Sequence, residues 1–339
     1  MGHVGILPII IVFTLSTAYC FPWFACSYCD APLHPEIVVW WGAIPGVFVI
    51  EGLLLPLEAL QHVAFHIKKH VFIQTFNYVL LPALFLLTGH TLSAAGLIKE
   101  DLLNGLTVLA SVPTTPTLSL YLTSMAAGDV PLAAFNATLG NMLAAIVSPL
   151  MLSMLRRPTE SVHFEAVLFG LTTKMIIPLT LGLCAQKVVK PPARKHAVFC
   201  NYVALTLVSL QIFSDAFYYG SADTRRKSVP FIICLTVSLQ CVALALCWVL
   251  GASRTVDATL QERVAMLFCS TQKSVVWGIP LLRIILSERS TEDLVVLSFP
   301  LLMYDVAQIF IGITLAYDLR PRIQRALVLE QLNAPLLKS

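Results

Sequence analysis

The chain has 339 residues, of which 57% are apolar and only 12% are charged, and its formal net charge is +3. A soluble domain typically carries about 25% charged residues, so this composition excludes an ordinary soluble protein and indicates a polytopic membrane protein. The small net charge gives no reason to expect a nucleic-acid partner.

The apolar residues fall into about ten segments, each near the roughly 20 residues that a helix needs to cross the hydrocarbon core. Short polar loops separate the segments and leave no room for a separate soluble domain. We therefore predict an all-α polytopic membrane protein with about ten transmembrane helices. The segments cover residues 4–22, 37–57, 70–92, 102–123, 130–155, 164–188, 197–219, 229–250, 263–286 and 293–317.

The first segment, ILPIIIVFTLSTAYC, could instead be the apolar part of a signal peptide. The five residues before it contain no Lys or Arg, so we expect a retained first span. Cys26 and Cys29 form a C-x-x-C pair in the loop that follows. Because two further metal ligands are not nearby, an ordinary loop or a disulfide is favoured over a metal site.

The distribution of Lys and Arg over the loops predicts the orientation of the chain. With ten spans both termini lie on one side of the membrane, and the loops of that side hold modestly more basic residues. We therefore expect both termini, with a tail at 319–339, in the cytoplasm.

Two of the ten segments are interrupted by helix-breaking residues together with a cluster of polar ones. The fourth includes Pro113 and Pro116 within VPTTPTLS, and the ninth includes the polar run STQKS followed by Gly278 and Pro280. Broken backbone at membrane depth needs protein or a cavity to satisfy it, and breaks at matching positions of two halves point to a transporter site. The breaks match if residues 1–155 and 156–318 are two inverted five-helix repeats. The alternative is a pair of proline kinks whose freed carbonyls are bonded by Ser and Thr.

Ionisable residues also lie inside the segments. An unpaired charge at the bilayer centre costs roughly 2.5–3.5 kcal/mol on insertion scales, so such groups normally pair. Lys273 and Asp305 lie near the middle of adjacent segments, and we predict an ion pair between them, with Asp215 as the second candidate partner. A purely structural ion pair is the alternative to a role in transport. Glu51 stands beside Gly52, a position that would suit a water-filled crevice.

The fifth segment carries Asn136 and Asn141 among small residues that would let another helix approach closely. The two amides either offer oxygen ligands to a cation or substrate, or simply hydrogen-bond between helices. Together with the broken segments they complete a candidate substrate and ion site. Its predicted members are Thr114, Thr115, Thr117, Ser119, Asn136, Asn141, Ser270, Thr271, Gln272, Lys273, Asp305 and Asp215.

Several long stretches carry a resemblance to a known family. Over roughly residues 32–317 the chain resembles the sodium/bile-acid cotransporter family (solute carrier family 10), and most closely its seventh-member branch. No P-loop, G-x-G-x-x-G or H-E-x-x-H motif competes with this interpretation, so we expect no enzyme. The stretches are PLHPEI, KKHVFIQTFNYVLLPA, GDVPLAAFNATLGNMLAAIVSPLML, VAMLFCSTQKSVVWGIPLLRII and LVVLSFPLLMYDVAQIFIG.

The resemblance implies a panel bundle and a core bundle, with the broken fourth and ninth helices crossing in the core. It implies a secondary-active symporter of a small organic anion that works by alternating access, in the plasma membrane or a secretory-pathway membrane. No cofactor is expected beyond sodium as coupling ion. The branch also implies an alternative, a non-transporting regulator of calcium entry and secretory-pathway homeostasis.

The chain departs from the family at the residues that the resemblance assigns to sodium. Gln272 matches a family Gln, but Phe268 stands where the family has a Glu, and Lys273 stands in place of an Asn. On the fourth helix Ser119 is followed by Leu120 instead of Asn. An ammonium would repel a cation bound beside it by several kcal/mol in a poorly screened site, which counts against sodium. We therefore hypothesise that Lys273 replaces a bound cation, paired with Asp305 or Asp215, or attracts an anionic group of the substrate.

Overall fold

The computed structural model describes residues 6–27, 29–55, 63–155, 164–189, 191–219, 222–285 and 291–333. Within these ranges the regular elements are all helical, as predicted. They are α1 (Ile6–Cys20), η1 (Pro22–Phe24), α2 (Pro35–Ile37), η2 (Val38–Ala43), α3 (Ile44–Leu54), α5 (Ile67–Thr75), η3 (Phe76–Leu80), α6 (Leu81–Ala94), α7 (Glu100–Ser111), α8 (Pro116–Met125), α9 (Val130–Leu155), α10 (Phe164–Leu171), η4 (Thr172–Ile176), α11 (Ile177–Ala185), α12 (Pro191–Tyr219), α13 (Ala222–Leu250), α14 (Leu260–Thr271), α15 (Val275–Ile285) and α16 (Thr291–Asn333).

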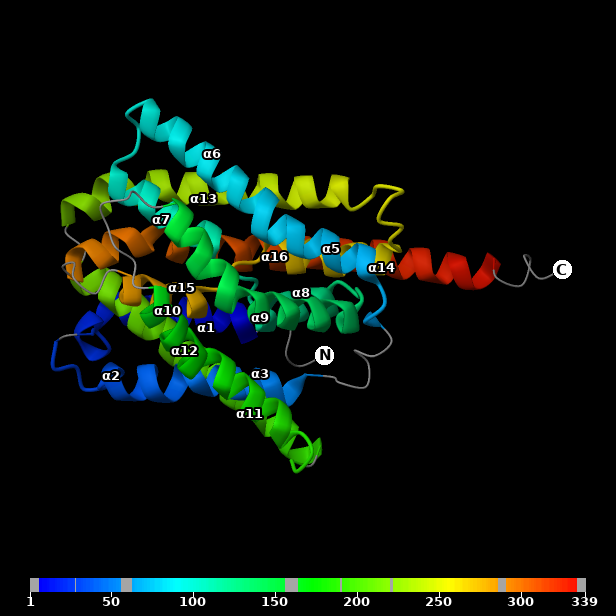
Figure 1. Cartoon of the computed structure of the whole chain (residues 1–339), viewed down its shortest axis with the longest axis horizontal. Helices are drawn as coiled ribbons and strands as arrows, with labels where there is room; N and C mark the ends of the chain where they lie inside the picture. The colour runs from blue at the N-terminus through cyan, green and yellow to red at the C-terminus, as the bar shows by residue number, and fades with distance from the viewer. Residues whose placement is uncertain are drawn as a thin grey trace.

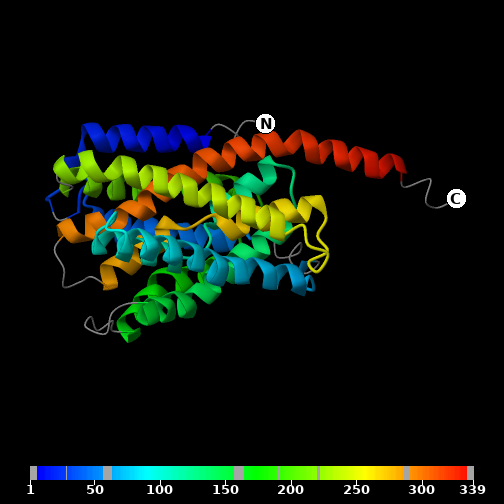
Figure 2. The same ribbon diagram turned by 90° about the horizontal axis from the view of Figure 1, so that it is seen from above.

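Most of the helices follow the long axis of the molecule (Figure 1). Helix α1 runs toward the left-hand end of that view, whereas α16 runs away from it and extends beyond the body at the right. Helix α1 lies along one edge of the molecule in the view from above (Figure 2), and it packs against α12. The loop between α1 and α2 therefore lies at the end of the molecule opposite to the last turn of α16.

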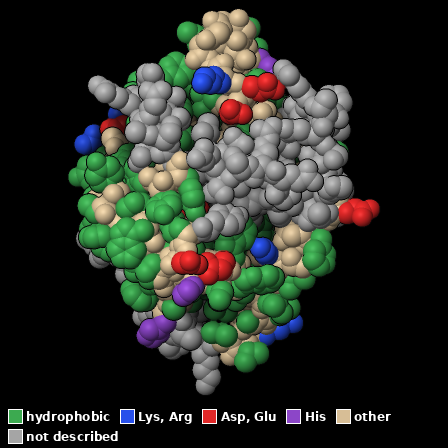
Figure 3. All heavy atoms as spheres, turned by 90° about the vertical axis from the view of Figure 1, so that its left-hand side faces the viewer, with side chains coloured by type: hydrophobic (Ala, Val, Ile, Leu, Met, Phe, Trp, Pro, Cys, Tyr) green, Lys and Arg blue, Asp and Glu red, His purple; other side chains and the backbone are tan. Residues whose placement is uncertain are grey.

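Six helices in the described ranges are long and apolar enough to cross a membrane, which confirms the polytopic membrane class. Two shorter apolar helices cover Pro8–Cys20 and Phe169–Ala185. The left-hand end of the molecule presents acidic, basic and histidine side chains among hydrophobic ones (Figure 3), as expected where helices leave lipid. The six long helices are Pro35–Leu54, Ile67–Ala94, Val130–Leu152, His196–Tyr219, Val229–Leu250 and Leu297–Leu329.

Helices α3 and α11 cross at two glycines. A Cβ atom added to Gly52 would lie 2.2 Å from the carbonyl oxygen of Leu179, and one added to Gly182 would lie 2.0 Å from that of Val49. Both separations are far shorter than a van der Waals contact, so the two backbones touch only because both positions lack a side chain. Lipid provides no hydrophobic driving force between helices, so van der Waals packing at this close approach stabilises the pair.

The C-terminal boundary differs from the prediction. The tenth segment was expected to end at 317, with a separate tail after it, but α16 continues without a break to Asn333. The residues between 319 and 333 include good helix formers such as Gln, Arg, Ala, Leu and Glu, which extend a helix already started in the apolar part. A fall in hydropathy marked the end of the apolar run and not the end of the helix.

Candidate functional site

Both predicted breaks are present. Helix α7 ends at Ser111 and α8 begins at Pro116, with extended backbone at Val112 and Thr115. Proline is well tolerated at the first position of a helix, where its missing N–H has no partner to lose. Helix α14 ends at Thr271 and α15 begins at Val275. The polar and proline-rich runs therefore mark interruptions and not bends in continuous helices.

The two breaks bond directly to each other. The backbone N–H of Ser274 donates to the carbonyl of Pro113 over 2.9 Å. The Thr115 hydroxyl donates to the Lys273 carbonyl over 2.7 Å, and the Thr114 hydroxyl donates to the Cys269 carbonyl. These threonines satisfy carbonyls of the opposite break and not those of their own helix. The breaks are therefore joined to each other, and threonine hydroxyls bond carbonyls that they free, as the alternative interpretation also expected.

Helix α16 supports the ninth-helix break from a third side. The Tyr304 hydroxyl donates to the Thr271 carbonyl over 2.9 Å. The Gln308 amide accepts from the Lys273 N–H at 2.7 Å and donates to the Lys273 carbonyl at 2.8 Å. One side chain thus replaces both backbone hydrogen bonds that Lys273 would make in a helix.

The ammonium of Lys273 lies in a cage of neutral oxygens. The residue is 1% exposed, and its Nζ donates to the Asn77 carbonyl at 3.1 Å and to Asn77 Oδ1 at 2.9 Å. It also reaches the carbonyls of Val112 at 2.8 Å and Ala110 at 3.4 Å. These last two lie at the end of α7, where carbonyls have no intrahelical donor and carry partial negative charge.

The predicted ion pair of Lys273 is wrong for both candidate partners. Asp305 instead accepts from the Gln308 amide over 2.7 Å, and it lines a separate cavity of about 60 Å³. Asp215 accepts from the backbone N–H of Ser27 at 2.5 Å and from its hydroxyl at 3.0 Å, in the loop after α1. Depth along a segment could not reveal that unpaired carbonyls at the break would supply the negative potential.

The other predicted residues of the breaks are buried around this crossing. The Ser119 hydroxyl donates to the Pro116 carbonyl over 3.1 Å and the Thr271 hydroxyl to the Leu267 carbonyl over 2.8 Å. Gln272 donates to the Thr271 hydroxyl over 3.3 Å, and its Oε1 has no partner among the described residues. Ser270 is fully buried on the last turn of α14.

The two asparagines of α9 have different environments. Asn136 Oδ1 lies 3.2 Å from His70 Nδ1 and the Asn136 carbonyl accepts from Gln74 over 3.0 Å, so this residue joins α9 to α5 by interhelical hydrogen bonds. Asn141 lines a cavity, and its buried Oδ1 has no partner within the described ranges. The sequence left both roles open: Asn136 makes interhelical hydrogen bonds, and a ligand role for Asn141 stays a prediction.

That cavity has a volume of about 310 Å³ and lies between α8 and α9 on one side and α3, α11 and α12 on the other. Thr117 on α8 joins the two sides of the cavity: its hydroxyl donates to Glu51 Oε1 over 3.0 Å and accepts from Asn201 Nδ2 over 3.1 Å. Most of the wall is apolar. Its lining residues are Glu51, Leu54, Leu55, Pro116, Thr117, Leu120, Tyr121, Ser124, Val130, Ala134, Thr138, Asn141, Leu179, Val198, Asn201 and Tyr202.

The sequence analysis did not single out Asn77, Gln308 or Asn201, and it suggested a crevice at Glu51 without including that residue in the site. Each is a polar residue within an apolar helix, and that was the available signal. Asn77 also lies in η3, a π-helical turn, and such turns are frequent at functional sites. The π-helical turn has no signature in one sequence that would have singled it out.

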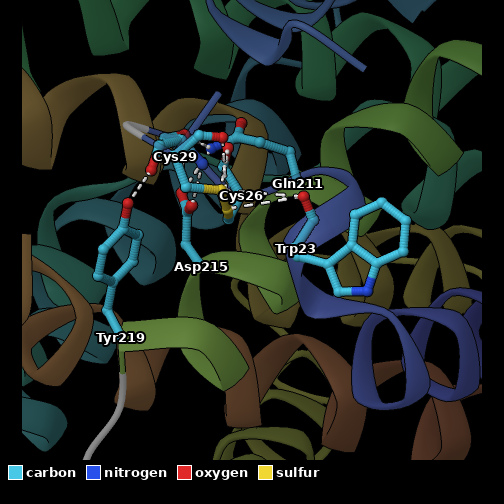
Figure 4. The surroundings of a disulfide bond; sticks show 7 residues. Trp23, Cys26, Cys29, Gln211, Asp215 and Tyr219 are labelled. Atoms are coloured by element: carbon cyan, nitrogen blue, oxygen red, sulfur yellow. Dashed lines mark hydrogen bonds between the residues drawn. A yellow bond between two sulfur atoms is a disulfide. The ribbon is translucent and has the colours of Figure 1, made fainter. Parts of the chain in front are cut away.

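The loop between α1 and α2 contains the disulfide between Cys26 and Cys29, one of the two favoured interpretations of the C-x-x-C pair. The loop is held on the end of α12 by several contacts (Figure 4). Gln211 donates to the Ser27 hydroxyl at 2.8 Å and to Asp215 Oδ2 at 2.7 Å, and the Tyr219 hydroxyl donates to the Ser27 carbonyl. Asp215 therefore anchors a loop at the end of the molecule and does not belong to the crossing.

Comparison with known proteins agrees with this architecture. The model of the SBF-like CPA transporter family matches residues 6–321. The chain is 32% identical to Sodium/bile acid cotransporter 7 of Danio rerio over 284 residues, which are 83% of this chain and 84% of that protein. It is 32% identical to the protein of the same name from Rattus norvegicus, covering 83% of each chain.

These matches confirm the resemblance seen in the sequence. They indicate an integral membrane transporter similar to sodium/bile acid cotransporters, and they do not point to an enzyme. The crossing of two broken helices beside a cavity is the arrangement expected of such a transporter. The chain belongs to the SBF-like CPA transporter family.

Proposed function

We propose that this protein is a secondary-active carrier that moves a small organic anion by alternating access at the crossing of α7/α8 and α14/α15. The single observation that carries the proposal is the pair of broken helices bonded to each other, with Ser274 N–H on the Pro113 carbonyl and Thr115 on the Lys273 carbonyl. In membrane proteins irregular backbone at this depth marks binding sites.

The proposal includes ten crossings in two inverted repeats, residues 1–155 and 156–318, with 319–339 on the cytoplasmic side. The order of helices supports it, because one interrupted helix pair occurs in each of the two ranges. The position of the disulfide loop supports the orientation. Disulfides persist in oxidising compartments, and this one lies at the end of the molecule opposite to the last turn of α16.

The cavity of about 310 Å³ supports the choice of solute. Its wall is largely apolar with a few polar groups, which suits an amphipathic molecule. The first turns of α8 and α15 begin at the breaks, and helix N-termini favour negative charge. The relatives are named for sodium and bile acid, and a bile acid is an organic anion.

The proposal assigns Lys273 the place of a bound cation at the crossing. Four oxygens surround its Nζ at 2.8–3.4 Å, as oxygens would surround a monovalent ion. The ammonium is thus a built-in charge that holds together the end of α7 and η3. A second cation beside it would be repelled, so sodium, if it is the coupling ion, binds elsewhere.

The test is uptake of radiolabelled organic anions, a bile acid among them, by the full chain reconstituted in liposomes with and without a sodium gradient. Ala134→Phe places a large side chain in the cavity and should abolish uptake. Met142→Phe, on the exposed side of the same helix, should leave it unchanged. Lys273→Gln should lower uptake without changing its cation dependence. Absence of uptake for every anion, or equal uptake by both phenylalanine variants, would contradict the proposal.

A further inference from the structure

Among the described residues, the carboxylate of Glu51 in the cavity wall has no cationic partner. Its Oε1 accepts from Thr117, while its Oε2 is buried with no partner among the described residues. None of the described Lys or Arg side chains forms an ion pair with it. A buried charge without a counter-charge is strongly unfavourable, so this position calls for a positive charge from outside the chain.

Two neighbouring amide oxygens also lack a donor among the described residues. The Thr117 hydroxyl donates its proton to Glu51, and the Asn201 amide donates one N–H to Thr117. The remaining oxygens, Asn201 Oδ1 and Asn141 Oδ1, are buried without a partner. Asn201 is 4% exposed and Asn141 is 2% exposed, and both line the cavity with Glu51. Three oxygens without donors therefore border one cavity.

The other ionisable groups near Glu51 do not supply that charge. Tyr121 and Tyr202 line the same cavity and are neutral phenols. On η4, which packs against α3, the ammonium of Lys174 lies over the Trp40 ring at 4.2 Å and over the Trp41 ring at 5.2 Å. These rings are on η2, ten residues or more before Glu51 in the same helical unit.

We propose that Glu51, together with the amide oxygens of Asn141 and Asn201, binds the coupling cation of the carrier, either a proton or a sodium ion. The inference rests on the proposed function, because it explains how an anion can enter a cavity that contains a carboxylate. Ionised Glu51 repels an organic anion, whereas Glu51 with a proton or sodium ion bound does not. The solute and the cation therefore bind together, which is the requirement for symport.

Carbodiimide labelling tests the site without any knowledge of the solute. Dicyclohexylcarbodiimide is apolar and adds to a protonated carboxyl group, leaving a stable N-acylurea that mass spectrometry locates on a peptide. The full chain in lipid nanodiscs is labelled across a pH series, in sodium chloride and in choline chloride. Glu51→Gln, which keeps the acceptor for Thr117, removes the target, and Asp305→Asn removes the other carboxylate near the crossing.

For a proton site, labelling of Glu51 falls several-fold as the pH rises and is the same in both salts. For a sodium site, sodium chloride lowers the labelling several-fold relative to choline chloride. Glu51 that is never labelled, or labelled equally at every pH and in both salts, overturns the inference. Failure of anion uptake with cation-sensitive labelling would reject only the proposed function, and uptake with insensitive labelling would reject only the cation site.

Discussion

The side-chain amide of Gln308 spans the backbone of Lys273, accepting from its N–H at 2.7 Å and donating to its carbonyl at 2.8 Å. Both groups lie in the three-residue gap between α14 and α15, where a helix cannot satisfy them. The gap is therefore held open by a residue 35 positions later in the chain. Helix α16 is part of the crossing although it is not itself broken there.

Gln308→Leu should destabilise the protein. It leaves the buried N–H of Lys273 without a partner, which costs about 1–3 kcal/mol, whereas the Lys273 carbonyl keeps the hydrogen bond from Thr115. Thermal unfolding in detergent would show the loss as a lower midpoint. Gln324→Leu is the matched control, because Gln324 is exposed on the same helix. Equal midpoints for the two variants would mean that Gln308 does not support the break.

Lys273→Met should also lower the unfolding midpoint, since it removes the three N–H donors that Lys273 directs to the cage of four oxygens. The substituted side chain keeps the apolar stem, so the loss comes from the unsatisfied Asn77 amide and the α7 carbonyls. Lys99→Met provides the comparison, because Lys99 is exposed. If the Lys273 variant were as stable as wild type, the cage would not depend on the ammonium.

Gly182→Ala should disrupt the packing of α11 on α3. The new methyl group would lie 2.0 Å from the Val49 carbonyl oxygen, which is backbone and cannot rotate away. We expect a loss of several kcal/mol, above the usual 1–3 kcal/mol of overpacking, measured by thermal unfolding and by expression level. Gly46→Ala on α3 has nothing within 4 Å of its added carbon and should be tolerated. Similar midpoints for both would contradict the observed crossing.

Glu262 should make stability depend on pH at the start of α14, outside the six long helices. Burial favours a higher pKa for this carboxyl, but hydrogen bonds from Lys69 and the Thr259 N–H outweigh it and hold the pKa below its ordinary 4.5. His66 Nδ1 lies 3.6 Å away. A lowered pKa means that ionised Glu262 stabilises the fold at neutral pH, and that this contribution disappears as the pH falls from about 4.5 through the lower folded value.

The measurement is the unfolding midpoint of wild type and Glu262→Gln across that acidic range. The difference between them should be largest at neutral pH and should shrink on acidification. Asp318→Asn removes an exposed pair with Arg322 and should give a nearly constant difference, because exposed ion pairs contribute little. A Glu262 difference that does not change with pH would show that the Lys69 contact is not an ion pair in solution.

The loop with the disulfide should lie on the side of the membrane that faces away from the cytoplasm. An Asn-X-Thr sequon inserted beside Asp30, an exposed loop residue, should therefore gain a glycan when the protein is made in a eukaryotic cell. The same sequon inserted after Asn333 should remain unmodified. Gel mobility with and without glycosidase digestion reads out both. A glycan on the C-terminal sequon and none on the loop would reverse the proposed orientation.

The sequence predicted local structure well, but it predicted poorly which side chains contact each other. Paired prolines and the STQKS run predicted both breaks, because proline and clustered polar residues have direct consequences for a helix. The pairing of Lys273 with Asp305 failed, since a single sequence gives depth along each helix but not which faces meet. Glu51 and Asn201 are about 150 residues apart and meet only through Thr117, so their shared cavity needed coordinates.

The cage around Lys273 Nζ has a consequence for how the protein depends on its surroundings. A dissolved ion at that position would come and go, and its residence would track the salt content of the adjoining compartment. The Lys273 side chain is covalently attached to the backbone and cannot dissociate. With Lys273 in its proposed role, the charge at the crossing does not depend on salt concentration, and a response to an ion gradient would come from groups elsewhere in the molecule.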